Sequence, residues 1–371
     1  MKKIKLAYIC EALGGGVRKH LVDLLNHVDK EKYDIHVIHG VNRMDSVFVS
    51  ATQQLANITF YPVQEMEREI SIKKDYVSVR KIIKILKKVQ PDIVHCHSSK
   101  AGVLGRISAK YTGVKKVYYT PHGYIIQNPN ISAKKRKVFG IIEKVLANKF
   151  TTKVIHVSKG EETEAINHRI LTEDKSVVIY NGMKIPQQKD KSPHKDFNIV
   201  TIARMDDQKN PWSAVKIIEG LIEEFPYIKY TYVGDGKYYE EIARYVKEKG
   251  LEENIKLPGF MDKPYEVLKS ADLFLLTSLY EGLPYALIEA MAFEVPVLAS
   301  NVTGNNELII DDYNGFLYNL NNIEEGKAKL TKLLKDKNKL ITMSENANQH
   351  FLDNFTIEKM IQTYENLYSK V

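Results

Sequence analysis

The sequence has little of several features that define other classes of protein. It has two cysteines, Cys10 and Cys96, too few for a disulfide-stapled fold, and both lie in apolar segments where we expect buried, reduced thiols. Its apolar runs fall far short of the ~20 residues that a membrane-spanning helix needs. The basic start is followed by a short apolar stretch that contains Lys5 and leads into glycines, so we expect no signal peptide and a cytoplasmic protein.

Metal-binding patterns are also scarce. The sequence contains no Asp-x-Asp, the motif that supplies metal-binding carboxylates in one large class of transferases. His95, Cys96 and His97 resemble a ligand cluster, but alternate residues of a strand share a face and no further compact ligand set follows. We therefore expect no metal site.

Charge is distributed unevenly along the 371 residues. Residues 1–190 carry 33 Lys and Arg against 18 Asp and Glu, a net charge of +15, whereas residues 191–371 carry 21 against 28, a net charge of −7. A basic half favours an anionic partner such as nucleic acid, anionic lipid or a phosphorylated substrate.

Short β-rich runs alternate with helical patterns from one end of the chain to the other. This rhythm predicts two doubly wound α/β domains, each with a parallel sheet covered by helices on both faces. The expected strands are 3–10, 34–39, 92–95, 116–120, 153–157, 198–203, 229–233, 254–257, 273–277, 295–300 and 316–318, and the expected helices include 17–27, 71–89, 131–150, 213–225, 238–249 and 283–293.

A polar stretch with two prolines, residues 184–197, has no apolar period and is typical of a linker. We therefore expect one domain over residues 1–187 and a second over 188–355. Residues 356–371 have the apolar spacing of a helix that docks on another surface.

Three loops could bind an anion or a sugar. The glycines at 14–16 lie between a strand and a helix, where a tight turn and a helix N-terminus favour a phosphate, although an ordinary turn is an alternative. Arg204 and Lys209 follow a predicted strand and could hold a diphosphate, or could be solvated surface charges. His122 also follows a strand, where a structural histidine is the alternative.

Glu281 and Glu289 form the most specific pair. They are eight residues apart around the start of a predicted, otherwise apolar helix, so we expect them on roughly the same face, where ligand hydroxyls would be suitable partners. The alternative is an acid at the start of the helix and an exposed glutamate on its surface.

Two basic amphipathic segments, 71–89 and 131–150, could lie on an anionic membrane. In the second, the candidate contacts are Lys134, Lys135, Arg136, Lys137 and Phe139. The alternative is a solvated lysine face above an apolar face that packs on the core.

Taken together, these motifs resemble the family-4 retaining glycosyltransferases of GT-B architecture over nearly the whole chain. The resemblance is carried by G-G-G at 14–16, H-S-S-K-A-G at 97–102, H-G at 122–123, V-S at 157–158, N-G at 181–182, Arg204 with Lys209, V-G-D-G at 233–236, G-F at 259–260, E-G-L-P through the second Glu at 281–289, N-N-E-L at 305–308 and N-G-F-L at 314–317. Members often have a second glycine where Asn305 stands here.

The resemblance implies two Rossmann-like domains that face each other across a cleft, with the final helix returning to the first domain. It implies that Arg204 and Lys209 neutralise the donor diphosphate, that Glu289 binds ribose, and that Glu281 binds the transferred sugar near His122. The remaining implied donor contacts are Gly15, Gly16, Gly259, Phe260, Gly282, Leu283, Thr303, Gly304 and Glu307.

We thus expect a metal-independent retaining glycosyltransferase without a cofactor, which uses a UDP-sugar as co-substrate. The expected acceptor is a polyprenyl-diphosphate-linked saccharide at the inner face of a bacterial membrane, in capsule or exopolysaccharide assembly, and we expect no nucleic-acid partner. The alternatives are a non-hydrolysing UDP-sugar epimerase and a non-catalytic basic protein that binds nucleic acid or membranes.

Overall fold

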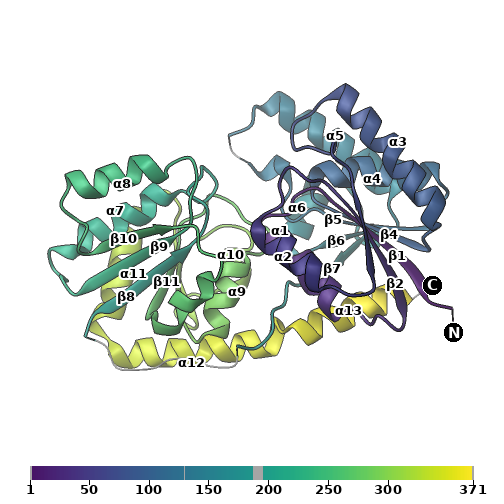
Figure 1. Cartoon of the computed structure of the whole chain (residues 1–371). Helices are drawn as coiled ribbons and strands as arrows, with labels where there is room; N and C mark the ends of the chain where they lie inside the picture. The colour runs from purple at the N-terminus through teal and green to yellow at the C-terminus, as the bar shows by residue number, and fades with distance from the viewer. Residues whose placement is uncertain (1, 129, 187–194, 370–371) are drawn as a thin grey trace. The chain divides into compact units, whose positions relative to one another are not determined.

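The computed structural model describes residues 2–128, 130–186 and 195–369. The chain divides into two compact units, shown with their elements in Figure 1. Unit 1 comprises Met1–Asn181 and Glu358–Val371, and unit 2 comprises Gly182–Ile357. Most of the expected linker, residues 187–194, lies outside the described residues.

Unit 1 is built on a seven-stranded parallel sheet in the order β3-β2-β1-β4-β5-β6-β7. Alternate apolar residues on both faces of this sheet are buried, Ala7 and Ile9 on one face and Leu6 and Tyr8 on the other, the pattern of a doubly wound fold. The strands are β1 (Ile4–Cys10), β2 (Tyr33–His39), β3 (Ile58–Pro62), β4 (Ile93–His97), β5 (Lys116–Thr120), β6 (Lys153–His156) and β7 (Ser176–Val178).

The helices of unit 1 include one from the far end of the chain. They are α1 (Gly15–His27), α2 (Ser46–Gln54), α3 (Ile72–Val89), α4 (Ser99–Tyr111), α5 (Ala133–Phe150), α6 (Lys159–Asn167) and α13 (Ile357–Ser369), with 3-10 turns at Ile125–Gln127 and Glu173–Lys175. Tyr368 on α13 bonds His95 Nδ1 at 2.7 Å, and Tyr118 donates to the Leu367 carbonyl at 3.3 Å. These contacts attach α13 to β4 and β5.

Unit 2 repeats the plan with a six-stranded parallel sheet in the order β10-β9-β8-β11-β12-β13. Its strands are β8 (Phe197–Ile202), β9 (Ile228–Val233), β10 (Ile255–Gly259), β11 (Leu273–Leu276), β12 (Val297–Ser300) and β13 (Gly315–Tyr318). Its helices are α7 (Pro211–Ile222), α8 (Tyr239–Glu248), α9 (Tyr285–Ala292), α10 (Asn305–Leu308), α11 (Ile323–Lys335) and α12 (Lys337–Asn354), with a 3-10 helix at Pro264–Ser270.

The predicted α/β class and parallel sheets are confirmed. Two strands were not expected: β3 is an edge strand with half-exposed residues, and β7 has only three residues. Both cysteines are free and buried, as predicted, and burial raises the pKa of Cys96 to about 12. Among the described residues, none of the helices combines the length and the apolar content that crossing a bilayer would require.

Candidate functional site

In unit 2, three loops meet at the carboxyl edge of the sheet. They follow the neighbouring strands β8, β11 and β12, and ligands of open α/β sheets bind at such an edge. Leu279 N donates to the Gln208 carbonyl at 2.7 Å, and Ser300 Oγ donates to the Ser278 carbonyl at 2.6 Å. Asn305 Nδ2 in turn donates to the Ser300 carbonyl at 3.0 Å. The loops therefore hold one another in place.

Lys209 and Glu281 form an ion pair at the centre of these loops. The distance from Nζ to Oε1 is 2.5 Å, and the side chains are only 16% and 7% exposed. Thr277 Oγ1 donates to the Lys209 carbonyl at 3.1 Å, which fixes the backbone beneath the pair. Two largely desolvated opposite charges are thus positioned where a phosphate and a hydroxyl-bearing ligand could both be bound.

Arg204 lies at the end of β8, with its side chain 55% exposed. Its Nε donates to Asp206 Oδ2 at 2.8 Å, and Asp206 Oδ1 also accepts the Lys209 backbone N–H at 3.2 Å. One aspartate therefore holds the Arg204 side chain and the Lys209 backbone on a single loop.

The prediction that Glu281 and Glu289 share a helix face is wrong. Pro284 is extended and α9 begins only at Tyr285, so Glu281 belongs to the preceding loop while Glu289 lies half-buried on the helix. The spacing of eight residues therefore does not measure two helical turns. The loop nevertheless brings Glu281 to Lys209, which the helical argument did not anticipate.

The other predicted donor contacts in unit 2 lie on loops at the same edge or just beyond it. Gly282 and Leu283 are buried beside Glu281, and Thr303, Gly304 and Glu307 surround the start of α10. Gly259 ends β10 at a φ of 77°, and the following Phe260 is 53% exposed. An exposed aromatic ring at this edge is available for stacking on a base.

Gly304 connects two of these loops at close range. Its φ is 84°, and a Cβ placed there would lie 2.4 Å from the Gly282 carbonyl oxygen. We predict that Gly304→Ala lowers the unfolding free energy of unit 2 by about 2–3 kcal/mol and raises the donor KM, because the strain and the clash displace the Glu281 loop.

Gly250→Ala is the matched control, since Gly250 has a φ of 65° but no atom within 4 Å of the added Cβ. Denaturant unfolding of both variants separates the clash from backbone strain. Equal losses of stability, with the donor KM unchanged for Gly304→Ala, would contradict the prediction.

In unit 1, two buried histidines, His20 and His97, and the half-buried His122 form a connected cluster at the carboxyl edge of the sheet. His97 Nδ1 and His122 Nε2 are hydrogen-bonded at 3.1 Å, and the rings of His20 and His122 are 4.7 Å apart. His20 Nδ1 bonds Asn181 Oδ1 at 3.0 Å and its Nε2 bonds the Tyr364 hydroxyl at 3.2 Å. His122 has a φ of 58°, so its backbone is held in a left-handed conformation at the end of β5.

Burial determines the protonation of this cluster. It lowers the pKa of His20 to about 4, and it lowers the pKa of His97 and His122 well below the usual value, with neighbouring histidines adding to the effect. The imidazoles are therefore neutral at pH 7 and can relay hydrogen bonds to His122.

No compact ligand set follows His97 in the sequence, but the fold brings one ring nitrogen from each of His20, His97 and His122 within 4.8 Å of the others. Hydrogen bonds to Asn181 and Tyr364 already engage both nitrogens of His20. The arrangement fits a hydrogen-bonded network, and the expectation of no metal remains a prediction.

The glycine loop after β1 contributes to the same edge of unit 1. Gly15 has a φ of 61° and opens α1, and both Gly15 and Gly16 are exposed. Glu11, at the start of the loop, is buried at 3% exposure and pairs with Arg43 at 3.2 Å. An exposed glycine turn at a helix N-terminus is open to an anion.

The basic segment 131–150 is only partly as expected. Lys134, Lys135 and Lys137 are exposed on α5, but Arg136 is half-buried and donates to the Asn128 carbonyl at 3.2 Å, and Phe139 packs against the core of unit 1. Phe139 faces inward because the apolar residues of α5 divide between two faces. The exposed apolar residues of this helix are Val138, Ile141, Ile142 and Val145.

The structure brings to these edges three residues that the sequence did not single out, Glu11, His20 and Arg43, and it adds Asn181, which the sequence marked only as part of the N-G motif. His20 follows the glycine loop by one helical turn, and H-S and H-G end the adjacent strands β4 and β5. His20 at this spacing, together with the H-S and H-G motifs, is a signal that could have predicted the histidine cluster.

Two family models match the chain and together cover most of it. Residues 14–185 match Glycosyltransferase Family 4, and residues 184–350 match Glycosyl transferases group 1. The chain is 30% identical, over 99% of its length and 97% of the other protein, to the Escherichia coli UDP-Gal:alpha-D-GlcNAc-diphosphoundecaprenol alpha-1,3-galactosyltransferase. It is also 30% identical to the Staphylococcus aureus capsular polysaccharide biosynthesis glycosyltransferase CapH, over 76% of this chain and 79% of CapH.

Solved structures show the same architecture. The Anabaena protein Alr3699/HepE, solved in complex with UDP-glucose, superposes with a TM-score of 0.82 at 22% identity and covers 99% of this chain and 100% of its own. At that identity the similarity establishes the fold, two Rossmann-like domains of the GT-B type.

Proposed function

Because the chain belongs to the glycosyltransferases, with family 4 and group 1 domains in its two halves, we propose that it transfers a sugar with retention from a UDP-sugar to a lipid-linked saccharide. The observation that carries this proposal is the pair of half-buried Lys209 and buried Glu281 beside Arg204 at the carboxyl edge of unit 2. Cations at this edge suit a leaving diphosphate, and carboxylates suit sugar hydroxyls.

The proposed chemistry needs no protein nucleophile, metal or cofactor. The bond between the anomeric carbon and the β-phosphate oxygen breaks, and the diphosphate leaves with the electron pair. The acceptor oxygen bonds to the same face of that carbon and its proton passes to the departing diphosphate. Lys209 and Arg204 stabilise the charge that develops, while Glu281 orients the transferred sugar. We propose that the neutral His122 either accepts a hydrogen bond from that sugar or donates one to it.

The acceptor is assigned to unit 1. The E. coli relative acts on a diphosphoundecaprenol-linked sugar, CapH acts in capsular polysaccharide biosynthesis, and residues 1–190 here carry a net charge of +15. We propose that α5 rests on the anionic inner face of the membrane through Lys134, Lys135 and Lys137 beside Ile141, which is 53% exposed. This places the protein in the cytoplasm, peripheral to the membrane.

A nucleotide panel tests the donor. UDP at 100 times its Kd is expected to stabilise unit 2 by about 2.7 kcal/mol, a shift of roughly 5–10 °C in thermal unfolding, and other nucleoside diphosphates by less. NMR of the UDP-sugar without acceptor should show slow hydrolysis. Isomerised sugar, or no stabilisation by UDP, would contradict the proposal.

Glu289→Ala is expected to weaken UDP binding and raise the donor KM by about 10- to 100-fold, because a charged hydrogen bond to ribose contributes about 1.5–3 kcal/mol. Glu253→Ala, an exposed glutamate before β10 at the amino edge of the same sheet, is the control and should leave both values unchanged. Isothermal titration measures UDP binding, and steady-state kinetics measures the donor KM. Wild-type KM in Glu289→Ala would remove the ribose role.

A further inference from the structure

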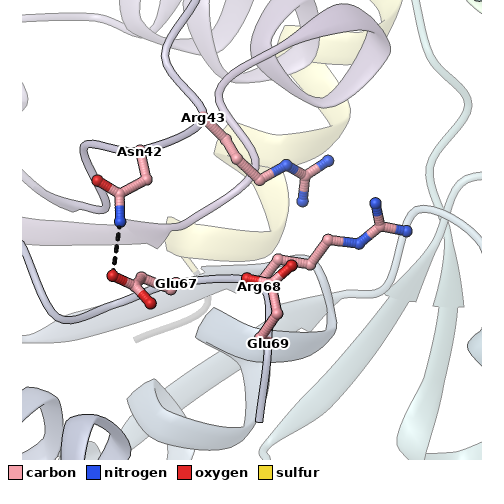
Figure 2. Close-up of a pocket in the computed structure, with 5 residues that line it drawn as sticks. All are labelled: Asn42, Arg43, Glu67, Arg68 and Glu69. Carbon is pink, nitrogen blue, oxygen red and sulfur yellow. Dashed lines mark hydrogen bonds between the residues drawn. The ribbon is translucent and has the colours of Figure 1, made fainter. Parts of the chain in front are cut away.

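The carboxyl edge of unit 1 has a second charged site, away from the histidine cluster and towards β2 and β3. A cavity of about 500 Å³ is lined by Asn42 and Arg43, which follow β2, and by Glu67, Arg68 and Glu69, which follow β3. Figure 2 shows the side chains of Arg43 and Arg68 extending in the same direction from their separate loops. The cavity thus presents two guanidinium groups from two adjacent strand ends.

The two loops are fixed to each other and to β1. Val63 N donates to the His39 carbonyl at 2.8 Å, and Gly40 N donates to the Cys10 carbonyl at 3.1 Å. Asn42 Nδ2 donates to Glu67 Oε1 at 2.9 Å, the bond drawn in Figure 2. A Cβ on Gly40 would lie 2.7 Å from the Met66 carbonyl oxygen, so the loops approach as closely as glycine allows. The site is therefore preorganised.

The charges of the cavity leave guanidinium N–H groups available. Buried Glu11 holds Arg43 through Nη1 alone, and among the described residues no hydrogen-bond acceptor contacts Nε or Nη2 of Arg43 or any nitrogen of Arg68. Glu67 is already neutralised by Lys74 at 2.6 Å. Glu69 is the carboxylate that still opposes an anion.

We propose that Arg43 and Arg68 bind the phosphate or diphosphate group that links the acceptor saccharide to its lipid. Guanidinium forks match the geometry of phosphate oxygens, and two of them from rigid loops suit a diphosphate. This inference rests on the proposed function, because it assigns a place to the anionic part of the proposed acceptor.

Strand order gives the separation that the acceptor must span. Arg43 follows β2 and His122 follows β5, three strand positions apart in the order β2-β1-β4-β5. At about 4.8 Å per strand these two strand ends are roughly 14 Å apart along the same edge. That distance accommodates the saccharide between its anchored diphosphate and the hydroxyl that receives the new sugar.

Inorganic diphosphate is the probe, titrated calorimetrically into the full-length protein saturated with UDP so that the donor site is occupied. We expect one diphosphate per chain in the wild type and a Kd raised at least tenfold in Arg68→Gln. Lys115→Gln, an exposed charge before β5 at the opposite edge, is the matched control and should bind as wild type. Absent binding in the wild type, or equal binding in Arg68→Gln, overturns the proposal.

Two further variants should change the affinity for diphosphate in opposite directions. Glu69→Gln should tighten diphosphate binding, because it removes the unneutralised carboxylate. Arg43→Lys should weaken it while keeping a cation beside Glu11, so that the fold is retained. If Glu69→Gln weakens binding, or Arg43→Lys leaves it unchanged, the assignment is wrong.

Vesicles distinguish the linking phosphate from a lipid headgroup. Arg68→Gln should co-sediment with vesicles containing anionic lipid as the wild type does. If this variant loses vesicle binding together with diphosphate binding, the cavity is a general membrane contact and the proposal is overturned. A wild type that UDP does not stabilise would refute the proposed function, while the diphosphate titration would still decide the role of Arg68.

Discussion

Lys209→Met is expected to lower kcat for sugar transfer by about 10²–10³-fold, the usual cost of removing one group that stabilises charge in the transition state. Its Nζ lies 2.5 Å from Glu281 at the carboxyl edge of unit 2, where the proposed leaving diphosphate gains its charge. The effect should appear both in transfer and in donor hydrolysis, since both reactions break the same bond. Steady-state kinetics with saturating donor measures it.

The same substitution also affects stability, and the two effects can be separated. Without Lys209, Glu281 is an unpaired carboxylate in a site where its side chain is 7% exposed, and breaking such a pair costs about 3–5 kcal/mol of unfolding free energy. In the double variant Lys209→Met/Glu281→Gln the unpaired charge is gone, so stability should largely return.

Activity should not return with it, because the double variant still lacks the cation. A double variant that regained most of the wild-type kcat would show that Lys209 acts only by holding Glu281. Wild-type kcat in Lys209→Met itself would eliminate the proposed role outright.

The fold could be predicted from the sequence because its signals are local. Runs of buried β-branched residues separated by amphipathic helices defined most of the strands of both sheets to within a few residues. The two missed strands lack that signal: in β3 no residue is fully buried, and β7 has three residues. Their positions depend on pairing with β2 and β6, which is tertiary information.

The site could be predicted only where a residue follows a strand within a motif. That held for Arg204, Lys209 and His122, which lie at strand ends as expected. It failed for the geometry of Glu281, because Pro284 delays the start of α9, and it could not identify Arg43 or Arg68. Those two arginines come together only because β2 pairs with β3, and this pairing places their two loops side by side.

Unit 1 is expected to lose stability steeply as the pH falls from 7 to 5, because five of its histidines, four of them fully buried and one half-buried, are held neutral. Burial lowers the pKa of His20 to about 4 and of His156 to about 3, and lowers the pKa of His95, His97 and His122 well below the usual value. A histidine whose pKa is lower in the folded than in the unfolded state stabilises the fold above its unfolded pKa. That contribution is lost as the pH falls below about 6.5, because only the unfolded chain then binds the proton.

For His20 and His156 the loss at pH 5 is about 2 kcal/mol each, and the other three act in the same direction, against a typical total of roughly 5–15 kcal/mol. Denaturant unfolding at pH 7.5 and pH 5.0 measures the difference. His156→Gln should reduce it by about 2 kcal/mol, since one protonation site is removed from the unfolded state. The exposed His27→Gln should leave it as in the wild type. Equal stability at the two pH values would mean that these imidazoles are protonated alike in the folded and unfolded chains, and the hydrogen-bonded network of neutral histidines around His122 would then be wrong.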